Sequence, residues 1–547
     1  MKHFKFKSVT TLANLKLSVK SSAIILAASS LLSAVLGLFR NRLLSSYYFG
    51  TYPVGIDAYT AAFTIPDFMF MILTSGALAV SFIPVFSQRL ASGNKKSAWE
   101  LSSSLINLFA IITLVASIFI MIFADPLIRY VVSPGLDESG MVLAINMTRV
   151  IAINPFLFSI AAVLTSIQQS VSRFIFYAFA PALYNVGIII GITCFTDGIN
   201  LFGLQLFEGG IMGVALGVIL GAVMQLIVSL IGLYGLGVDY EFKIYAKNQG
   251  FRSVLKLLPA RSLDQGIDYA NSIVSTNLAS RMSAGSIWAY NLATSLQQMP
   301  VSLIGVAIST AFFPQLSDSA NADNEKDFCD TLRSALNMII WLALPIAVIF
   351  FFARGYFASL VNNLSVSASG SIILSSALGA LAVSVFASSV FHIASRGFYA
   401  KQDTKTPLYI SIFAVGLNIA LSILFYNLDL DVIGLGLAQS IAALLEIFIL
   451  LAILNRRLKR QLLSKTFWRH LFRIIFASAI TACVAYSMTK FVPLMATDVS
   501  LVITIPKLAL ICAVSALAYL IASYFLDLEE IHPLLSWLKK ALFKNVK

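Results

Sequence analysis

The chain has 547 residues, of which 59 % are hydrophobic and 12 % charged, and its mean hydropathy is +0.87. Soluble globular domains carry about 25 % charged residues, so this composition excludes an ordinary soluble enzyme or binding module. The net charge of +13 could indicate a nucleic-acid partner, but the positions of the basic residues, given below, indicate membrane topology instead.

Apolar segments long enough to cross about 30 Å of hydrocarbon recur along the whole chain. The predicted fold class is therefore an all-α polytopic membrane protein. We predict fourteen membrane-spanning helices, at 22–45, 56–88, 101–124, 145–170, 176–197, 209–235, 253–281, 285–317, 333–353, 370–395, 406–427, 432–455, 470–492 and 501–526.

Basic residues are distributed unevenly between the two sets of loops. The loops 46–55, 198–208 and 428–431 contain no Lys or Arg, whereas the basic tail 1–21 and the alternate loops are rich in them. The positive-inside rule then places both termini in the cytoplasm. The first apolar run could mimic a signal peptide, but it continues into Arg40 and further spans, which favours an uncleaved helix.

Three pairs of similar segments recur in the same order, which predicts an internal duplication. We expect two parallel six-helix halves, 22–240 and 253–457, around a central cavity, an architecture typical of alternating-access transporters. The pairs are 77–87 with 307–317, 172–185 with 395–418, and 210–217 with 432–438.

The remaining segments lie outside the duplication. An interfacial linker is expected at 241–252, and the tail 528–547 has the pattern of an amphipathic cytoplasmic helix. The two additional helices within 458–527 either form a lipid-facing groove or partner contact, or only add packing.

Catalytic signatures are missing from the sequence. It has no Gly-rich phosphate loop, no His-x-x-x-His motif and no credible triad, so we expect a non-enzyme without cofactor or metal. The four cysteines have no zinc or disulfide spacing and are expected to fill apolar space. An ion gradient, the membrane potential or the substrate's own gradient would then drive any transport.

Charged residues within spans are costly and mark candidate sites. Arg261, Asp264 and Asp268 share one helical face; they either line a cavity, with the two aspartates able to couple a cation, or form a self-satisfied ion pair. Glu446 is either a cavity group or a protonated, packed residue, and Asn418 is a further candidate for ion coupling.

Arg40 and Asp57 flank the first predicted turn. A guanidinium suits bidentate recognition of phosphate, so Arg40 either binds substrate or anchors the helix at the interface. Asp57 either lines the cavity or faces interfacial water.

Five stretches resemble the lipid II flippase family (MurJ, formerly MviN) of the multidrug/oligosaccharidyl-lipid/polysaccharide exporter superfamily. The resemblance implies fourteen helices in the bacterial inner membrane, and export of an undecaprenyl-pyrophosphate-linked disaccharide-peptide for peptidoglycan synthesis and cell shape, with cell-wall synthesis proteins as candidate partners. The stretches are VLGLFRNRLLSSYYFG (35–50), DAYTAAFTIPDF (57–68), RFIFYAFAPALYN (173–185), NLATSLQQMPVSLIGVAISTAFFPQLS (291–317) and SRGFYAKQDTKTPLYISIFAVGLN (395–418).

The resemblance carries two of the family's functional residues onto Arg40 and Asp57. The resemblance implies further arginines at the positions occupied here by Ala34, Phe70, Met71 and Ser295, and acidic residues at those occupied by Asn41 and Ser75. Because the family's cavity arginines would meet a pyrophosphate, two alternatives stay open. One is export of another lipid-linked oligosaccharide or an amphipathic drug, and the other is a non-transporting cell-wall scaffold.

Overall fold

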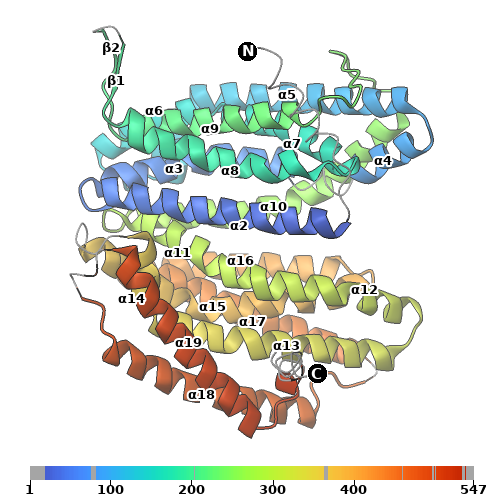
Figure 1. Cartoon of the computed structure of the whole chain (residues 1–547), viewed down its shortest axis with the longest axis vertical. Coiled ribbons are helices and arrows are strands. Elements are labelled where there is room, and N and C mark those ends of the chain that lie inside the picture. Colours follow the sequence, from blue (N-terminus) through green and yellow to red (C-terminus); the bar gives the residue numbers. More distant parts are fainter. Residues whose placement is uncertain are drawn as a thin grey trace, which may run out of the picture. The chain divides into compact units, whose positions relative to one another are not determined.

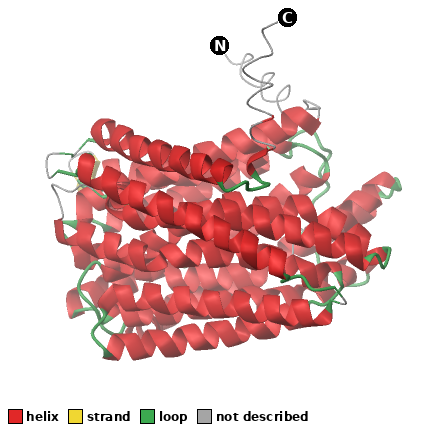
Figure 2. Ribbon diagram, turned by 90° about the horizontal axis from the view of Figure 1, so that it is seen from below, coloured by secondary structure: helices red, strands yellow, loops and turns green. Residues whose placement is uncertain are grey.

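The structure is a computed structural model that describes residues 19–75, 82–201, 204–362, 368–458, 460–495, 498, 500–532 and 536. Contacts divide the chain into two compact units, Met1–Ala284 and Gly285–Lys547, each of which is described by itself (Figure 1). Nearly all described elements are helices that run side by side within their unit (Figure 2).

The first unit contains nine α-helices, four short π-helical segments and two strands in its described part. In chain order they are α2 (Val19–Leu44), η1 (Ser45–Phe49), α3 (Pro53–Phe70), η2 (Met71–Ser75), α4 (Ile83–Ala91), α5 (Lys95–Pro126), η4 (Leu127–Val132), α6 (Glu138–Ile151), α7 (Asn154–Ser170), α8 (Phe174–Ile190), η5 (Gly191–Phe195), β1 (Ile199–Leu201), β2 (Leu204–Phe207), α9 (Met212–Ile231) and α10 (Gln249–Ser280).

The described part of the second unit is helical throughout. It consists of α11 (Ser286–Val301), η6 (Ser302–Val306), α12 (Ala307–Asn321), α13 (Glu325–Phe352), α14 (Arg354–Val361), α15 (Ala368–Ala400), α16 (Lys405–Asn427), α17 (Asp431–Arg457), α18 (Lys465–Phe491) and α19 (Leu501–Phe525).

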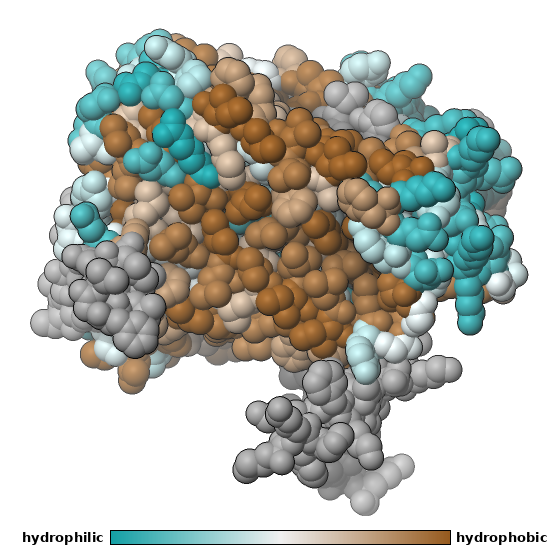
Figure 3. Space-filling model, turned by 90° about the horizontal axis from the view of Figure 1, so that it is seen from above, coloured by the Kyte–Doolittle hydropathy of each residue, from teal (hydrophilic) through white to brown (hydrophobic). Residues whose placement is uncertain are grey.

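The helical membrane class predicted from the sequence is confirmed. Among the described residues, 12 segments are long and apolar enough to cross a membrane. Helices α2 and α10 coincide with two more of the predicted spans, 22–45 and 253–281, and the total of fourteen stays a prediction. Figure 3 shows one face on which apolar residues form a broad band, with hydrophilic residues gathered at its ends.

The loop 198–208 contains a small two-stranded hairpin within this helical fold. Strands β1 and β2 pair antiparallel, with Leu201 opposite Leu204. Gly198 and Gly209 lie at the base of the hairpin with φ of +85° and +96°, a region open to glycine at little cost. The sequence between the two glycines shows a short alternation of apolar residues, which is too short to distinguish strands from a loop.

Elements of the two units recur in the same order. In chain order α3 is followed by η2 and α4, and α11 is followed by η6 and α12. Asn94 and Asn324 then cap α5 and α13, and each accepts a backbone N–H at 3.2 Å. The boundaries of the predicted halves, 22–240 and 253–457, stay a prediction, since the contacts place α10 within the first unit, against α3, η2 and η4.

Helices α8 and α9 approach each other through glycines. A Cβ on Gly187 would lie 2.3 Å from the Cα of Gly221, and one on Gly217 would lie 2.5 Å from the Cα of Gly191. Carbon atoms normally pack at about 3.5–4.0 Å, so no side chain fits in this seam. Small residues at membrane-helix interfaces permit such close backbone packing, which fixes α8 and hence the site residues it carries.

The two C-terminal helices belong to the second unit. The Tyr519 hydroxyl of α19 donates to the carbonyl oxygen of Trp341 on α13 at 2.7 Å, and the Trp341 indole donates to Ser523 at 3.2 Å. All three side chains are buried. These hydrogen bonds hold α19 against α13. Helix α18 packs on both α13 and α19. Most of the tail 528–547 and of the N-tail 1–21 lies outside the described residues.

Candidate functional site

Arg40 lies near the C-terminal end of α2, and its guanidinium is held from two sides. Its Nε and Nη2 donate to Oδ1 of Asn41 at 3.1 and 2.9 Å, and its Nη1 donates to Oδ1 of Asn185 on α8 at 2.9 Å. A guanidinium has five N–H groups, so these bonds leave donors for a further acceptor. The side chain is half-buried. Because Arg40 belongs to α2, its remaining N–H donors lie within a predicted membrane-spanning helix.

Asn185 connects the Arg40 guanidinium to the backbone of α2. Its Nδ2 donates to the carbonyl oxygen of Ser33 at 3.2 Å, while its Oδ1 accepts from Arg40. The side chain is 8 % exposed. Because both ends of the amide are engaged, Asn185 fixes the rotamer of Arg40 and packs α8 against α2 at the same point.

Two acidic residues lie on α3, the neighbouring membrane helix. Asp57 is 2 % exposed, where α3 packs against α6, so it does not face interfacial water. Asp67 is half-buried in the last turn of α3. Tyr59, itself buried, is within electrostatic range of both Arg40 and Asp67, which makes this end of the first unit a polar region built from α2, α3 and α8.

An aromatic wall borders this polar region. The ring of Phe158 on α7 meets Phe70 at a centroid distance of 5.6 Å and Tyr184 at 5.2 Å, both edge to face. Tyr184 is in turn within electrostatic range of Arg40 and Asp67. Phe70 occupies a position for which the family resemblance implied arginine, so this surface offers aromatic packing where a second guanidinium was expected.

Candidates in the second unit lie on α16 and α17. Glu446 accepts a hydrogen bond from Ser411 at 2.7 Å, and the amide of Asn418 accepts one from Ser422 at 3.4 Å. Asn418 is 4 % exposed, whereas Glu446 is half-buried. Glu446 is thus a hydrogen-bonded group between two helices, and its role in ion coupling stays a prediction.

The stripe of Arg261, Asp264 and Asp268 lies on α10. Helix α10 runs unbroken from Gln249 to Ser280, which is consistent with the shared face predicted for these residues. Their side chains lie outside the part that the structure describes, so their lining role stays a prediction. Among the described residues, no cluster of three or more His, Cys, Asp or Glu side chains could hold a metal.

Sequence reasoning missed the residues that position Arg40. Asn185 was visible only as the end of a repeated segment whose second copy ends on Asn418. The recurrence of an asparagine in both copies of an apolar helix could therefore have marked Asn185 as a candidate. Its contact with Arg40 on α2 follows only from the packing of α8. Tyr59 and Phe158 gave no signal at all, since aromatic residues are common in membrane helices.

Comparisons of the sequence with known proteins all point to one family. A family model described as Lipid II flippase MurJ matches residues 45–507. Probable lipid II flippases from Rhizobium tropici and from Buchnera aphidicola subsp. Schizaphis graminum are 23 % and 26 % identical to this chain, covering 93 % and 94 % of it and 95 % and 98 % of their own lengths. The lipid II flippase of Burkholderia cenocepacia is 27 % identical over 70 % of this chain and 73 % of its own.

Solved structures support the same fold. A lipid II flippase MurJ in an inward closed conformation superposes with a TM-score of 0.73 at 24 % identity, covering 92 % of this chain and 98 % of that one. An inward-facing multidrug transporter of the MATE family gives 0.63 at 18 % identity, covering 80 % and 98 %. The polytopic helical fold, the duplicated elements and a family match that spans most of the sequence lead to one conclusion: this chain belongs to the MurJ lipid II flippase family.

Proposed function

We propose that the chain is a flippase that moves lipid II, the lipid-linked peptidoglycan precursor, from the inner to the outer leaflet of the bacterial cytoplasmic membrane by alternating access. Family membership supports the reaction, and the uneven distribution of basic loops supports cytoplasmic termini. The observation that carries the proposal is Arg40, a guanidinium held by Asn41 and Asn185 in a membrane helix with donors to spare. Such a group suits a pyrophosphate.

Each candidate residue has a separate role in this proposal. Arg40 binds the pyrophosphate, and Asp57 belongs to the same part of the binding cavity. Arg261, Asp264 and Asp268 line the cavity from α10. A monovalent cation couples to transport through Asp264, Asp268, Glu446 and Asn418, and proteins of cell-wall synthesis receive the flipped precursor.

The aromatic wall favours a second candidate function. Phe70 and Phe158 pack edge to face at 5.6 Å, and the resemblance implied two arginines in place of Phe70 and Met71. Phe158 also meets Tyr184, which is within electrostatic range of Arg40. One guanidinium with aromatic neighbours suits an amphipathic drug or a lipid-linked oligosaccharide with less phosphate charge. This candidate uses the same fold and the same Arg40, and differs only in cargo.

Depletion of the protein in its own bacterium is expected to cause lysis, with the lipid-linked precursor accumulating on the inner leaflet. The reason is that a polar disaccharide-peptide cannot cross hydrocarbon unaided at a useful rate. The measurement is leaflet-specific labelling of the precursor during depletion, with a plasmid-borne wild-type copy as control. Normal growth with an unchanged leaflet distribution would contradict the proposal.

A further inference from the structure

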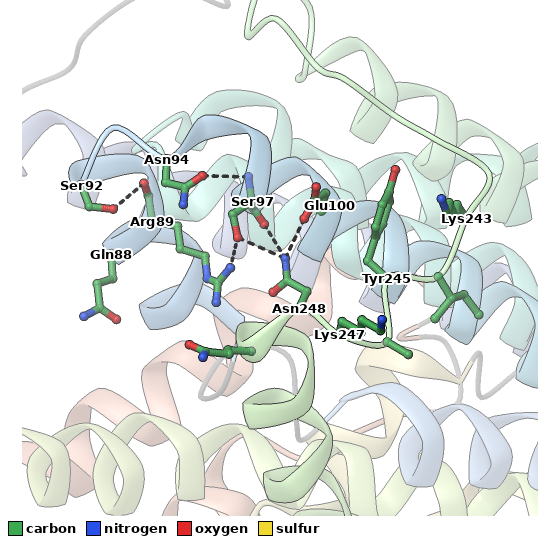
Figure 4. A pocket seen from close by; sticks show the side chains of 13 residues that line it. Gln88, Arg89, Ser92, Asn94, Ser97, Glu100, Lys243, Tyr245, Lys247 and Asn248 are labelled. Carbon is green, nitrogen blue, oxygen red and sulfur yellow. Dashed lines mark hydrogen bonds between the residues drawn. The ribbon is translucent and has the colours of Figure 1, made fainter.

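The first unit has a polar groove at one end, well away from Arg40 in sequence. It lies between the α4–α5 turn and the segment that precedes α10, and its volume is about 930 Å³ (Figure 4). Both segments belong to the face that the positive-inside rule predicts to be cytoplasmic. Arg89, Lys243 and Lys247 supply three positive charges to the lining and Glu100 supplies one negative charge.

Hydrogen bonds fix both walls of the groove. The segment before α10 is held along α5, where Asn107 donates to the carbonyl oxygens of Glu241 and Lys243 at 2.8 and 3.1 Å. At the other end, Asn248 donates to Glu100 at 3.2 Å and to the carbonyl oxygen of Ser97 at 3.1 Å. The groove is therefore preformed, and a ligand would not have to order its walls on binding.

Two helices begin at the groove. Asn94 caps α5, and Asn248 caps α10 by accepting the backbone N–H of Gly250 at 3.0 Å. The Arg89 guanidinium lies so close to this turn that a Cβ on Gly250 would be 2.7 Å from its Cζ. Helix N-termini carry partial positive charge, which adds to the charge of the side chains.

The cations of the groove form no ion pair with any residue that the structure describes. Arg89 donates to the Ser97 hydroxyl, and the Lys243 ammonium lies 5.1 Å from the centre of the Tyr245 ring. Within the described part of the chain, no carboxylate lies within 4.0 Å of the charged groups of Arg89, Lys243 and Lys247. The nearby Glu241 accepts the Tyr245 hydroxyl, and this hydrogen bond raises the pKa of Tyr245 to about 12.

The corresponding turn of the second unit differs in its charged residues. Helix α13 begins 230 residues after α5 with the same Asn cap, but the position that corresponds to Arg89 is Ser319, which donates to Asp327 at 2.6 Å. Further along α13, Arg333 pairs with Asp330 at 3.3 Å, and Arg460 pairs with the same carboxylate at 3.4 Å. The second copy of the turn thus has two arginines paired with one carboxylate, whereas the three cations of the groove form no ion pair within the described residues.

We propose that this groove is a binding site for a phosphate group, carried either by an anionic phospholipid or by a soluble phosphate ester. Three cations that form no ion pair with the described residues, two helix N-termini and the side-chain amides of Gln88 and Gln249 match the charge and acceptor number of a phosphate. The groove lies at the ends of membrane helices, within reach of both sources. It is separate from the Arg40 site, and its occupancy does not depend on which cargo the protein carries.

The test is binding to the purified full-length chain in detergent. Native mass spectrometry with phosphatidic acid and phosphatidylcholine measures the lipid arm, and calorimetric titration with inorganic phosphate measures the soluble arm. The Lys243→Gln/Lys247→Gln variant is expected to weaken binding about tenfold or more, since charge-assisted hydrogen bonds to phosphate are stronger than neutral ones. Both lysines are exposed, so the variant should still fold.

A matched control carries the same change of charge outside the groove. Lys95→Gln/Lys96→Gln removes two exposed cations from the first turn of α5, and should change affinity less than about twofold, as expected for screened surface charges. Preference for phosphatidic acid over phosphatidylcholine supports a lipid source, and saturable binding of inorganic phosphate supports a soluble one. Absence of saturable binding in both arms, or equal weakening by the two double variants, would overturn the proposal.

Discussion

Arg40→Ala is expected to reduce the rate of lipid II flipping about 10- to 100-fold while the protein remains at normal abundance in the membrane. The variant removes a charge-assisted contact worth about 1.5–3 kcal/mol, together with the three hydrogen bonds that Arg40 makes to Asn41 and Asn185. Arg40→Lys keeps the charge but cannot reproduce the fork geometry, so it should recover only part of the rate. The measurement is initial flipping rate in proteoliposomes with quantified protein.

The control is Arg129→Gln in the same unit. Arg129 is partly exposed and pairs with Glu138 at 3.1 Å near the end of the span, and exposed pairs of this kind contribute little to stability. Its removal should leave flipping unchanged. Full activity of Arg40→Ala would exclude a substrate role for Arg40 and would favour a scaffold that does not transport.

Gly217→Ala is expected to lower the yield of folded protein sharply. The new Cβ would lie 2.5 Å from the Cα of Gly191 and 2.9 Å from the carbonyl oxygen of Gly187, both of them backbone atoms that no rotamer change can move. Overpacking typically costs about 1–3 kcal/mol, and a rigid backbone neighbour puts this site at the upper end. The measurement is apparent melting temperature and monodisperse yield after purification in detergent.

Gly416→Ala is the matched control. Gly416 lies in the interior of α16, where an added Cβ meets no atom within 4 Å, and alanine is favoured over glycine in a helix by about 0.5–1 kcal/mol. This variant should be as stable as the wild type or slightly more stable. If both variants behaved alike, close packing of α8 on α9 would not be what holds the first unit together.

Much of the fold could be predicted from sequence because the bilayer imposes a strong pattern. Long apolar segments predicted the positions of nearly all membrane-spanning helices, and three pairs of similar segments predicted the duplication. The breaks inside the spans could not be predicted, since the π segments η2 and η6 depend on how neighbouring helices pack. The hairpin at 198–208 was missed because its strands have only 3 and 4 residues.

The site was predicted in part. Arg40 could be chosen because charge in a membrane helix is costly, and its side chain does lie in a polar setting. Its orientation comes from Asn185, 145 residues away, and no local pattern encodes a contact of that range. The groove beside Lys243 was not predicted either. Ser104 and Asn107 of α5 hydrogen-bond to the segment that forms one wall of the groove, but in the sequence they are simply uncharged polar residues within an apolar span.

The central claim is that this chain flips lipid II, and reconstitution tests it most directly. Purified protein in liposomes with fluorescent lipid II, exposed to a membrane-impermeant quencher with and without an imposed potential, reports how much lipid II reaches the outer leaflet. We predict that quenching proceeds beyond the half that is initially exposed, and faster than for a less phosphorylated lipid-linked oligosaccharide. Quenching that stops at the level of protein-free liposomes under both conditions would contradict the claim.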